Sequence, residues 1–284
     1  MPQPLPQAPK VSANGCEIPA IGLGTWPMLG EECARSVATA LAVGYRHIDT
    51  APRYENEEAV GEGIRAGGVP RADFHITTKV WWDKIGAGDL EASAEASLKR
   101  LGVDYVDLLL IHWPNPKIPL ADSIASLNAC KRQGFARHIG ISNFPTRLMN
   151  EALALTKEPL VCDQVEYHPY LDQSKIYANC RKNGMALISY CPLGRGASGG
   201  LFSDKVITEI AAAKKVTPSQ IVLRWHVQQP GVVAIPKSAT PERIRENLDV
   251  FSFSLTDAEM AAITALKRPD GRVVKLDFAP EWDT

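Results

Sequence analysis

The stretch "YRHIDTAPRY", residues 45–54, places Asp49 and Tyr54 directly after a short run that is typical of a β-strand. Lys79 closes the next strand-like run, and His112 closes the one after it. A tyrosine has a reference pKa of about 10, so it donates a proton near neutral pH only if its phenolate is stabilised. An adjacent Lys79 ammonium group could do this. Asp49 could keep Lys79 charged and in place, and His112 could orient a substrate oxygen.

Taken alone, each of these residues also has an ordinary structural interpretation. Asp49 could cap a nearby helix, Tyr54 could be an aromatic at a rim, and Lys79 could be a solvated strand end. His112 could be a hydrogen-bonded histidine of the core. Only the combination favours a site for proton transfer.

Such a site requires strands that bring these residues to one rim. A stretch with helical spacing follows each of eight strand-like runs, which are residues 20–25, 45–50, 75–80, 106–112, 136–142, 161–167, 186–192 and 231–236. This alternation requires parallel strands joined by helical crossovers. The Asn14-Gly15 pair, between two short extended runs, predicts a tight β-hairpin ahead of them.

Two α/β architectures fit this alternation, a closed barrel and an open doubly wound sheet. The open sheet would usually show G-x-G-x-x-G where its first helix begins, and "IGLGTWPMLG" at 21–30 does not match. We therefore predict a single-domain (β/α)8 TIM barrel with an N-terminal β-hairpin over residues 11–284, after a flexible leader, residues 1–10. Active sites of such barrels lie at the C-terminal ends of the strands, where the unusual residues fall.

Composition favours small-molecule chemistry. The formal net charge of -1 over 284 residues offers no basic face for nucleic acid or for an anionic membrane. The opening "MPQPLPQAPK" is unlike a signal peptide, and no run approaches a membrane span, so we expect a cytoplasmic protein. The six cysteines show no CxxC spacing and are interpreted as reduced packing residues. Nothing in the sequence implies an obligate protein partner.

The motifs at these strand ends resemble those of the aldo-keto reductase family along almost the full chain. They are "GLGTW" (22–26), "YRHIDTA" (45–51), "NEEAVG" (56–61), "ITTKVW" (76–81), "YVDLLLIHWP" (105–114), "IGISNF" (139–144), "QVEYHPYL" (164–171), "YCPLGRG" (190–196) and "IPKSATPERIRENL" (235–248). The resemblance implies that Asp49, Tyr54, Lys79 and His112 are the catalytic tetrad. Tyr54 would then act as general acid beside hydride transfer from NADPH to a carbonyl.

The resemblance also implies an NADPH/NADP site without a Rossmann fold. Contacts to the nicotinamide end and the pyrophosphate would come from Thr25, Asp49, Ser142, Asn143, Gln164, Tyr190, Leu193, Gly194 and Gly196. Asp163 departs from the Asn that many relatives carry before this glutamine. It does little harm if it points away from the site.

The segment "IPKSATPERIRENL" is predicted to bind the 2′-phosphate of the cofactor. Lys237, Ser238 and Arg243 lie between the last strand and the first turns of a helix, where free N–H groups and the helix dipole favour an anion. An ordinary capped helix with surface bases is the alternative. The resemblance adds Glu246 and Asn247 as adenine contacts.

The substrate pocket is expected to have aromatic walls. Four tryptophans follow the ends of three different strands, and with His112 they would surround a carbonyl compound; they are Trp26, Trp81, Trp82 and Trp113. The loop "HWPNP" (112–116) and the ending "APEWD" (279–283) are most similar to bacterial 2,5-diketo-D-gluconic acid reductases of the B type. We therefore expect small dicarbonyl substrates, such as diketo sugar acids or methylglyoxal. The segment "VVKLDF" (273–278) differs from many relatives and is expected to border the pocket. Family members are commonly monomers.

Other functions remain open at this point. Lys79 could form a Schiff base in a lyase, although a neighbouring Asp49 would keep it charged and poorly nucleophilic. The same barrel could serve as a non-catalytic binding or structural protein. A zinc hydrolase is disfavoured, because His47, Asp49 and His112 lack a ligand spacing such as HExxH, and no metal is predicted.

Overall fold

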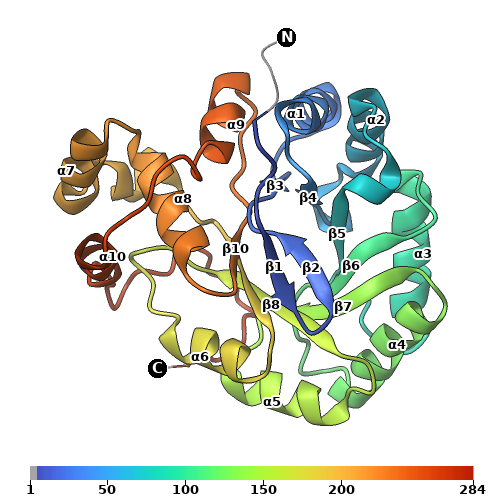
Figure 1. Cartoon of the computed structure of the whole chain (residues 1–284). Coiled ribbons are helices and arrows are strands. Elements are labelled where there is room, and N and C mark those ends of the chain that lie inside the picture. Colours follow the sequence, from blue (N-terminus) through green and yellow to red (C-terminus); the bar gives the residue numbers. More distant parts are fainter. Residues whose placement is uncertain (1–4, 284) are drawn as a thin grey trace.

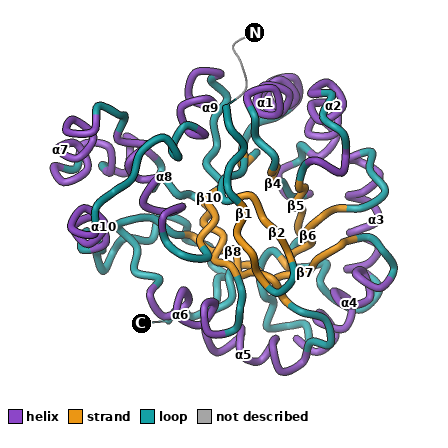
Figure 2. The backbone as a smooth tube through the Cα atoms, in the orientation of Figure 1, coloured by secondary structure: helices purple, strands orange, loops and turns teal. Residues whose placement is uncertain are grey.

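Eight parallel strands form a curled sheet with helices around its outside in the computed structural model, which describes residues 5–283 (Figures 1 and 2). Neighbours in the sheet follow chain order. The strands are β3 (Leu23–Gly24), β4 (His47–Asp49), β5 (His75–Val80), β6 (Val106–Ile111), β7 (Ala136–Ser142), β8 (Leu160–Glu166), β9 (Ala186–Tyr190) and β10 (Val232–Ala234).

Among the described residues, eight helices lie in the connections between strands, and two more follow the last strand. They are α1 (Gly30–Val43), α2 (Glu57–Gly67), α3 (Asp89–Leu101), α4 (Leu120–Arg132), α5 (Thr146–Leu155), α6 (Ser174–Lys182), α7 (Lys205–Lys214), α8 (Pro218–Gln228), α9 (Pro241–Leu248) and α10 (Asp257–Thr264). Each of the eight predicted runs overlaps one of the strands β3 to β10, so the predicted α/β barrel is confirmed.

The barrel closes between its first and last strands. Ile21 forms a parallel bridge with Ala234, and the Gly22 amide donates to the Ala234 carbonyl at 2.9 Å. At Gly24 the chain passes so close to the opposite strand that an added Cβ would lie 2.7 Å from the Ile235 carbonyl oxygen. Only glycine fits this contact. The strand β3 is shorter than the run 20–25 predicted for it.

The predicted hairpin is also present, as β1 (Lys10–Ala13) paired with β2 (Cys16–Pro19). Asn14 and Gly15 have φ angles of 44° and 84°, which the tight turn requires. The Asn14 side chain donates to the Leu160 carbonyl at 2.8 Å and to the Asn183 carbonyl at 3.0 Å. These contacts place the hairpin across the N-terminal ends of the strands and leave the opposite end for the site (Figure 1).

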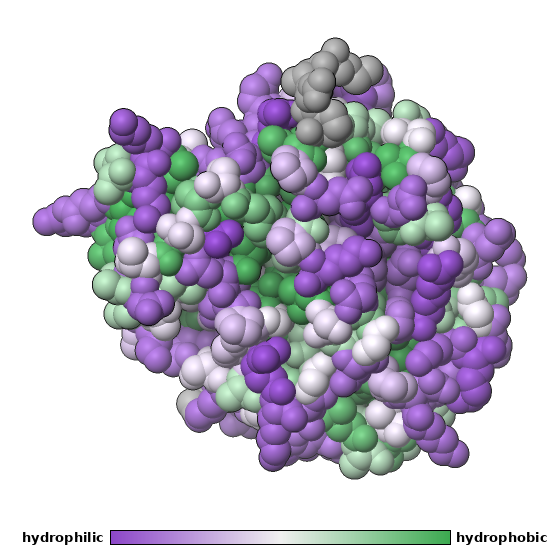
Figure 3. Space-filling view, viewed as in Figure 1, coloured by the Kyte–Doolittle hydropathy of each residue, from purple (hydrophilic) through white to green (hydrophobic). Residues whose placement is uncertain are grey.

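Two apolar clusters hold the strands in place. The larger cluster fills the layer between strands and helices, and the smaller fills the barrel interior around Leu108, Leu110 and Ile188. Five of the six cysteines are buried and Cys191 is half-buried, all of them as free thiols. The face seen in Figure 3 is mostly polar, with apolar residues scattered among charged ones. Within residues 5–283, no helix combines the length and apolar character needed to cross a membrane.

Candidate active site

Four titratable side chains meet at the C-terminal ends of β4, β5 and β6. Asp49 ends β4, Lys79 is the penultimate residue of β5, and His112 follows β6 directly. Tyr54 ends a short 3-10 turn, Pro52–Tyr54, in the loop after β4. Lys79 Nζ donates to Asp49 Oδ1 at 2.6 Å and to the Tyr54 hydroxyl oxygen at 3.4 Å. The predicted group of four is therefore brought together.

The surroundings of Lys79 keep it protonated. Both side chains of its ion pair with Asp49 are buried. Burial alone would lower the pKa of Lys79, but the Asp49 carboxylate and the Tyr54 hydroxyl outweigh this and raise the pKa above its ordinary value. A lysine held in the ammonium form is a poor nucleophile, which disfavours Schiff-base chemistry.

Lys79 and burial act in opposite directions on Tyr54. Burial raises the pKa of the Tyr54 phenol above its ordinary value, and the Lys79 charge opposes that rise. Tyr54 is thus fully protonated at neutral pH, and the ammonium beside it stabilises negative charge that develops on its oxygen. This arrangement suits a general acid.

His112 completes the group as a neutral imidazole. Its ring lies edge-on to the Tyr54 ring, with centroids 5.7 Å apart. Burial lowers the pKa of His112 well below its usual range, and the charges of Lys79 and Arg53 lower it further. Nδ1 is buried and has no hydrogen-bond partner among the described residues. A neutral ring can donate one hydrogen bond to a substrate oxygen.

A hydrogen-bonded network surrounds the free oxygen of Asp49. Gln164 Nε2 donates to Asp49 Oδ2 at 2.8 Å, and Ser142 Oγ donates to the Gln164 carbonyl at 2.7 Å. Asn143, in the left-handed conformation at φ 64°, accepts from the Tyr190 hydroxyl at 2.8 Å. All four of these side chains were predicted to contact nicotinamide, and they lie together at the ends of β7, β8 and β9.

Thr25 was predicted to bind the cofactor, and Asp163 was expected to do little harm if it points away from the site. Thr25 Oγ1 donates to the Asp49 carbonyl at 3.1 Å. Asp163 is buried on the face of β8 opposite to Gln164, where Oδ1 accepts from the Phe144 amide at 3.5 Å. Burial raises the pKa of Asp163 well above its usual range. Because the two side chains point to opposite faces of β8, the Asp163 carboxyl group lies away from the Gln164 amide.

An aromatic wall borders the four titratable residues. It consists of five side chains, namely Trp81, Trp82, Trp113, Phe278 and Trp282. Trp81 lies edge-on to His112 at 5.0 Å, and Phe278 stacks on Trp82 at 4.6 Å. Trp26 was also predicted as a wall residue, but its side chain is 54% exposed and contacts no aromatic ring of the described residues.

Comparison with known proteins identifies the family. The chain matches the family described as "Aldo/keto reductase family" over residues 20–268. The chain belongs to the aldo-keto reductase family. It is an oxidoreductase of that family.

Individual aldo-keto reductases resemble it over nearly their full length. Methylglyoxal reductase DkgB of Escherichia coli O157:H7 is 40% identical over 269 residues, covering 94% of this chain and 99% of that protein. A crystal structure provisionally assigned as 2,5-diketo-D-gluconic acid reductase B is 47% identical, covers 98% of both chains and has a TM-score of 0.95. The Bombyx mori aldo-keto reductase, crystallised in complex with NADP, is 33% identical, covers 96% of both chains and has a TM-score of 0.89.

The remaining residues predicted to bind NADPH lie at the same end of this reductase. After β9, Leu193, Gly194 and Gly196 belong to a tight turn in which both glycines have positive φ angles, 52° and 63°. After β10, Lys237 and Arg243 are exposed on either side of the start of α9. The other members of this segment are Ser238, which is buried and accepts from the Thr240 amide, Glu246, which is half-buried, and Asn247, which is buried.

This set of groups fits a nicotinamide dinucleotide phosphate. Buried amides and the Tyr190 ring suit the nicotinamide end. A glycine turn lets the backbone approach a pyrophosphate closely. Exposed cations beside a helix start suit a phosphate. No cluster of three or more His, Cys, Asp or Glu side chains in residues 5–283 could hold a metal ion.

The C-terminal tail, residues 272–283, supplies two wall residues that sequence reasoning did not identify, Phe278 and Trp282. Glu166, the last residue of β8, is fully buried and accepts from the Val273 amide at 2.7 Å and the Val274 amide at 2.9 Å. The segment 273–278 had been expected to border the pocket. Its aromatic residue was the available signal, but nothing local showed which strand holds the tail.

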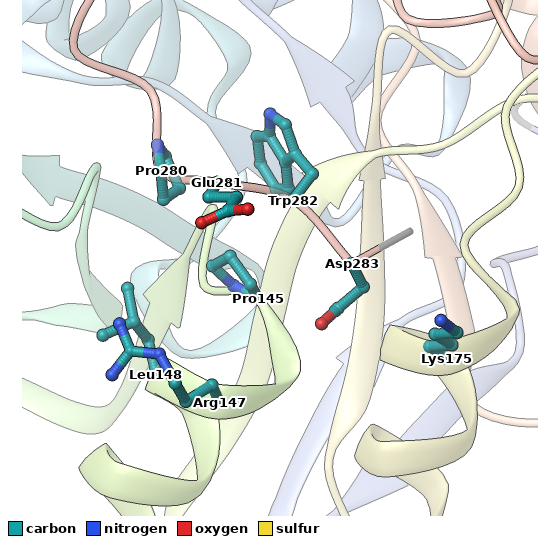
Figure 4. Close-up of a pocket in the computed structure, with 8 residues that line it drawn as sticks. All are labelled: Pro145, Arg147, Leu148, Lys175, Pro280, Glu281, Trp282 and Asp283. Atoms are coloured by element: carbon teal, nitrogen blue, oxygen red, sulfur yellow. The ribbon is translucent and has the colours of Figure 1, made fainter.

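A second carboxylate holds the far end of the tail. Asp283 accepts from the Thr146 amide at 2.9 Å, at the start of α5, and also from the Thr146 hydroxyl. Figure 4 shows Trp282 and Asp283 beside Pro145, around a cavity of about 320 Å³. None of the four titratable residues lines this cavity. It therefore lies apart from the four titratable residues.

Proposed function

We propose that this protein is an NADPH-dependent reductase of small dicarbonyl compounds, in which Tyr54 is the general acid. The observation that carries the proposal is the buried chain of contacts from Asp49 through Lys79 to the Tyr54 hydroxyl, at 2.6 and 3.4 Å. An apolar pair of residues could fill the same buried space equally well, so these contacts are not explained by stability alone.

In the proposed mechanism, Tyr54 gives its proton to the carbonyl oxygen as negative charge develops there. Lys79 stabilises the charge left on the phenol oxygen, and Asp49 holds Lys79 in the ammonium form. Neutral His112 orients the substrate oxygen by a hydrogen bond. When bound, NADPH supplies the hydride that reaches the carbonyl carbon. The aromatic wall excludes water from the reacting groups.

The cofactor would be held along one arc of strand ends. Ser142, Asn143 and Gln164 would bind the carboxamide while the Tyr190 ring stacks on the nicotinamide, near Thr25 and Asp49. The turn at Leu193, Gly194 and Gly196 would approach the pyrophosphate. Lys237, Ser238 and Arg243 would bind the 2′-phosphate, and Glu246 and Asn247 the adenine.

Two relatives support the substrate class. One is named methylglyoxal reductase, and the other is provisionally assigned to 2,5-diketo-D-gluconic acid, so both names refer to compounds with two carbonyl groups. The aromatic wall suits a small planar carbonyl.

The central test is Tyr54→Phe, assayed as oxidation of NADPH with methylglyoxal and with 2,5-diketo-D-gluconate. We expect kcat to fall by about 10²- to 10⁴-fold. NADPH binding, followed by fluorescence titration, should change little, because the phenol acts on the substrate. Tyr177→Phe is the matched control, since the Tyr177 hydroxyl donates to the Pro230 carbonyl far from the site. A Tyr54→Phe enzyme that keeps most of its kcat would refute the assignment.

The phosphate site has its own test. Arg243→Ala removes a charge-assisted hydrogen bond, which contributes about 1.5–3 kcal/mol, so NADPH should bind about ten- to a hundredfold more weakly. NADH, which lacks the phosphate, should bind almost unchanged. Arg35→Ala on α1 is the control, because Arg35 is exposed and forms an ion pair with Glu31. Equal losses for both cofactors would mean that Arg243 does not bind the phosphate.

A further inference from the structure

Two arginines contact the aromatic wall through cation–π interactions. The Arg272 guanidinium lies 3.6 Å from the Trp282 ring centroid, and the Arg53 guanidinium lies 5.5 Å from the Trp81 ring centroid. The two guanidinium groups differ in how exposed and how strongly paired they are. The Arg272 side chain is only 16% exposed and lies 3.8 Å from the buried carboxylate of Glu166. The Glu166 carboxylate therefore already balances the Arg272 charge.

Arg53 is the arginine of the two that could bind an anion from solution. Its side chain is 58% exposed, and its ion-pair partner is Glu55 at 3.7 Å, whose side chain is 77% exposed. An exposed pair at this distance contributes little, because water screens both charges. Another anion could therefore replace Glu55 at small cost.

The position of Arg53 is set by the catalytic turn itself. Arg53 directly precedes Tyr54 in the turn Pro52–Tyr54, and Glu55 ends the turn in the left-handed conformation, at φ 57°. Trp81, which Arg53 contacts, lies edge-on to His112. The Arg53 charge contributes less to the lowered pKa of His112 than burial and the Lys79 charge do, so Arg53 lies near the four titratable residues without belonging to them.

We propose that Arg53 binds a carboxylate on the substrate and so makes the enzyme select acidic carbonyl compounds over neutral ones. This inference rests on the carbonyl reduction proposed above. The planar guanidinium matches a carboxylate with two parallel hydrogen bonds, and the Trp81 ring fixes its plane. Because one aromatic ring separates Arg53 from His112, the carboxylate must lie several bonds from the reacting carbonyl. Between the two expected dicarbonyls, this favours a diketo sugar acid over methylglyoxal.

The test compares 4-carboxybenzaldehyde with its methyl ester, methyl 4-formylbenzoate. Both offer the same aldehyde at the same distance, and only the acid carries a charge. We expect Arg53→Gln to lower kcat/KM for the acid by about ten- to a hundredfold and for the ester by less than about twofold. Arg53→Lys should lie between wild type and Arg53→Gln, because it restores the charge without the planar fork.

Two further variants sharpen the test. Glu55→Gln removes the competing carboxylate and should raise kcat/KM for the acid by about twofold, with no change for the ester. Arg35→Gln is the matched control, as another exposed arginine that pairs with one glutamate, and it should change neither substrate.

The outcomes separate this inference from the proposed function. Equal losses for acid and ester in Arg53→Gln, or an unchanged ratio between them, would overturn the role of Arg53 while reduction itself stands. If the wild-type protein with NADPH reduces neither compound, and reduces neither methylglyoxal nor 2,5-diketo-D-gluconate, the proposed function fails and the inference falls with it. An acid-specific loss in Arg53→Gln, with both reactions abolished in Tyr54→Phe, supports both.

Discussion

Asp49 and Glu166 are both the last residue of a barrel strand, and both are almost completely buried. Asp49 receives its hydrogen bonds from two side chains, the Lys79 ammonium and the Gln164 amide. Glu166 receives two of its hydrogen bonds from backbone amides of the C-terminal tail, Val273 and Val274. A buried carboxylate is tolerated only when strong hydrogen-bond donors surround it, and both oxygens of Asp49 and of Glu166 have such donors.

The difference lies in what each set of donors does. Lys79 is titratable and donates to the Tyr54 hydroxyl, so in the proposed mechanism the Asp49 site adjusts proton transfer. Glu166 contacts two fixed peptide amides of the tail, His168 Nε2 at 3.0 Å and the Arg272 guanidinium at 3.8 Å, so that site holds the tail in place. The segment it holds carries Phe278 and Trp282, which complete the aromatic wall. At the same end of the barrel, one buried carboxylate thus serves the proposed chemistry and another holds the C-terminal tail.

The largest effect should follow removal of the Lys79 charge. Lys79→Met leaves Asp49 buried without its cation, so we expect a loss of about 3–5 kcal/mol in the free energy of unfolding. We also expect kcat to fall by about 10²- to 10⁴-fold. Urea unfolding and NADPH oxidation measure the two effects. The double variant Asp49→Asn/Lys79→Met should regain stability but not activity. A single variant that unfolds at the wild-type urea concentration would contradict the cost assigned to the pair.

The residual activity of Lys79→Met should also show a changed pH profile. Tyr54 must be protonated to act as the acid, so turnover falls as the pH rises through its pKa. Burial raises the pKa of Tyr54 and Lys79 opposes this, so loss of Lys79 raises the pKa further. The alkaline limb of kcat should therefore move to higher pH. If the alkaline limb of kcat stayed at the same pH, Lys79 would have no role in proton transfer.

Glu166→Gln should change KM more than kcat, unlike Lys79→Met. Glutamine offers one acceptor oxygen in place of two, so one tail amide loses its partner, and we expect a loss of about 1.5–3 kcal/mol. The looser tail should raise KM for aromatic aldehydes several-fold while kcat stays within about threefold. Hydrogen exchange at Val273 and Val274 should become faster. If kcat fell as far as in Lys79→Met, the division between chemistry and architecture would be wrong.

The smallest effect is expected at the far end of the tail. Asp283→Ala removes a cap from the start of α5, and such caps contribute about 1 kcal/mol. The melting temperature should fall by about 2 °C and KM for aromatic aldehydes should rise by about twofold. Asp283→Asn, which can still accept from the Thr146 amide, should keep most of the wild-type behaviour. A loss as large as that of Glu166→Gln would show that the tail is held mainly by Asp283.

Local patterns in the sequence determined the fold class and the place of the four titratable residues. β-branched runs alternating with helical spacing predict parallel strands, and residues at the ends of such strands must share one rim. Asn14-Gly15 predicts the hairpin, because only residues that accept positive φ fit its turn. These features depend on neighbours a few positions away, which the sequence displays directly.

Only the tertiary structure decided which distant residues meet. Glu166 and its tail partners are separated by 107 and 108 positions, and Asp283 and Thr146 by 137. Four tryptophans follow strand ends, yet Trp26 is exposed while Phe278 from the tail stacks on Trp82. Whether a ring lines the pocket depends on the path of a segment without regular structure. That path is set by a few long-range hydrogen bonds to buried carboxylates, and no local periodicity reveals them.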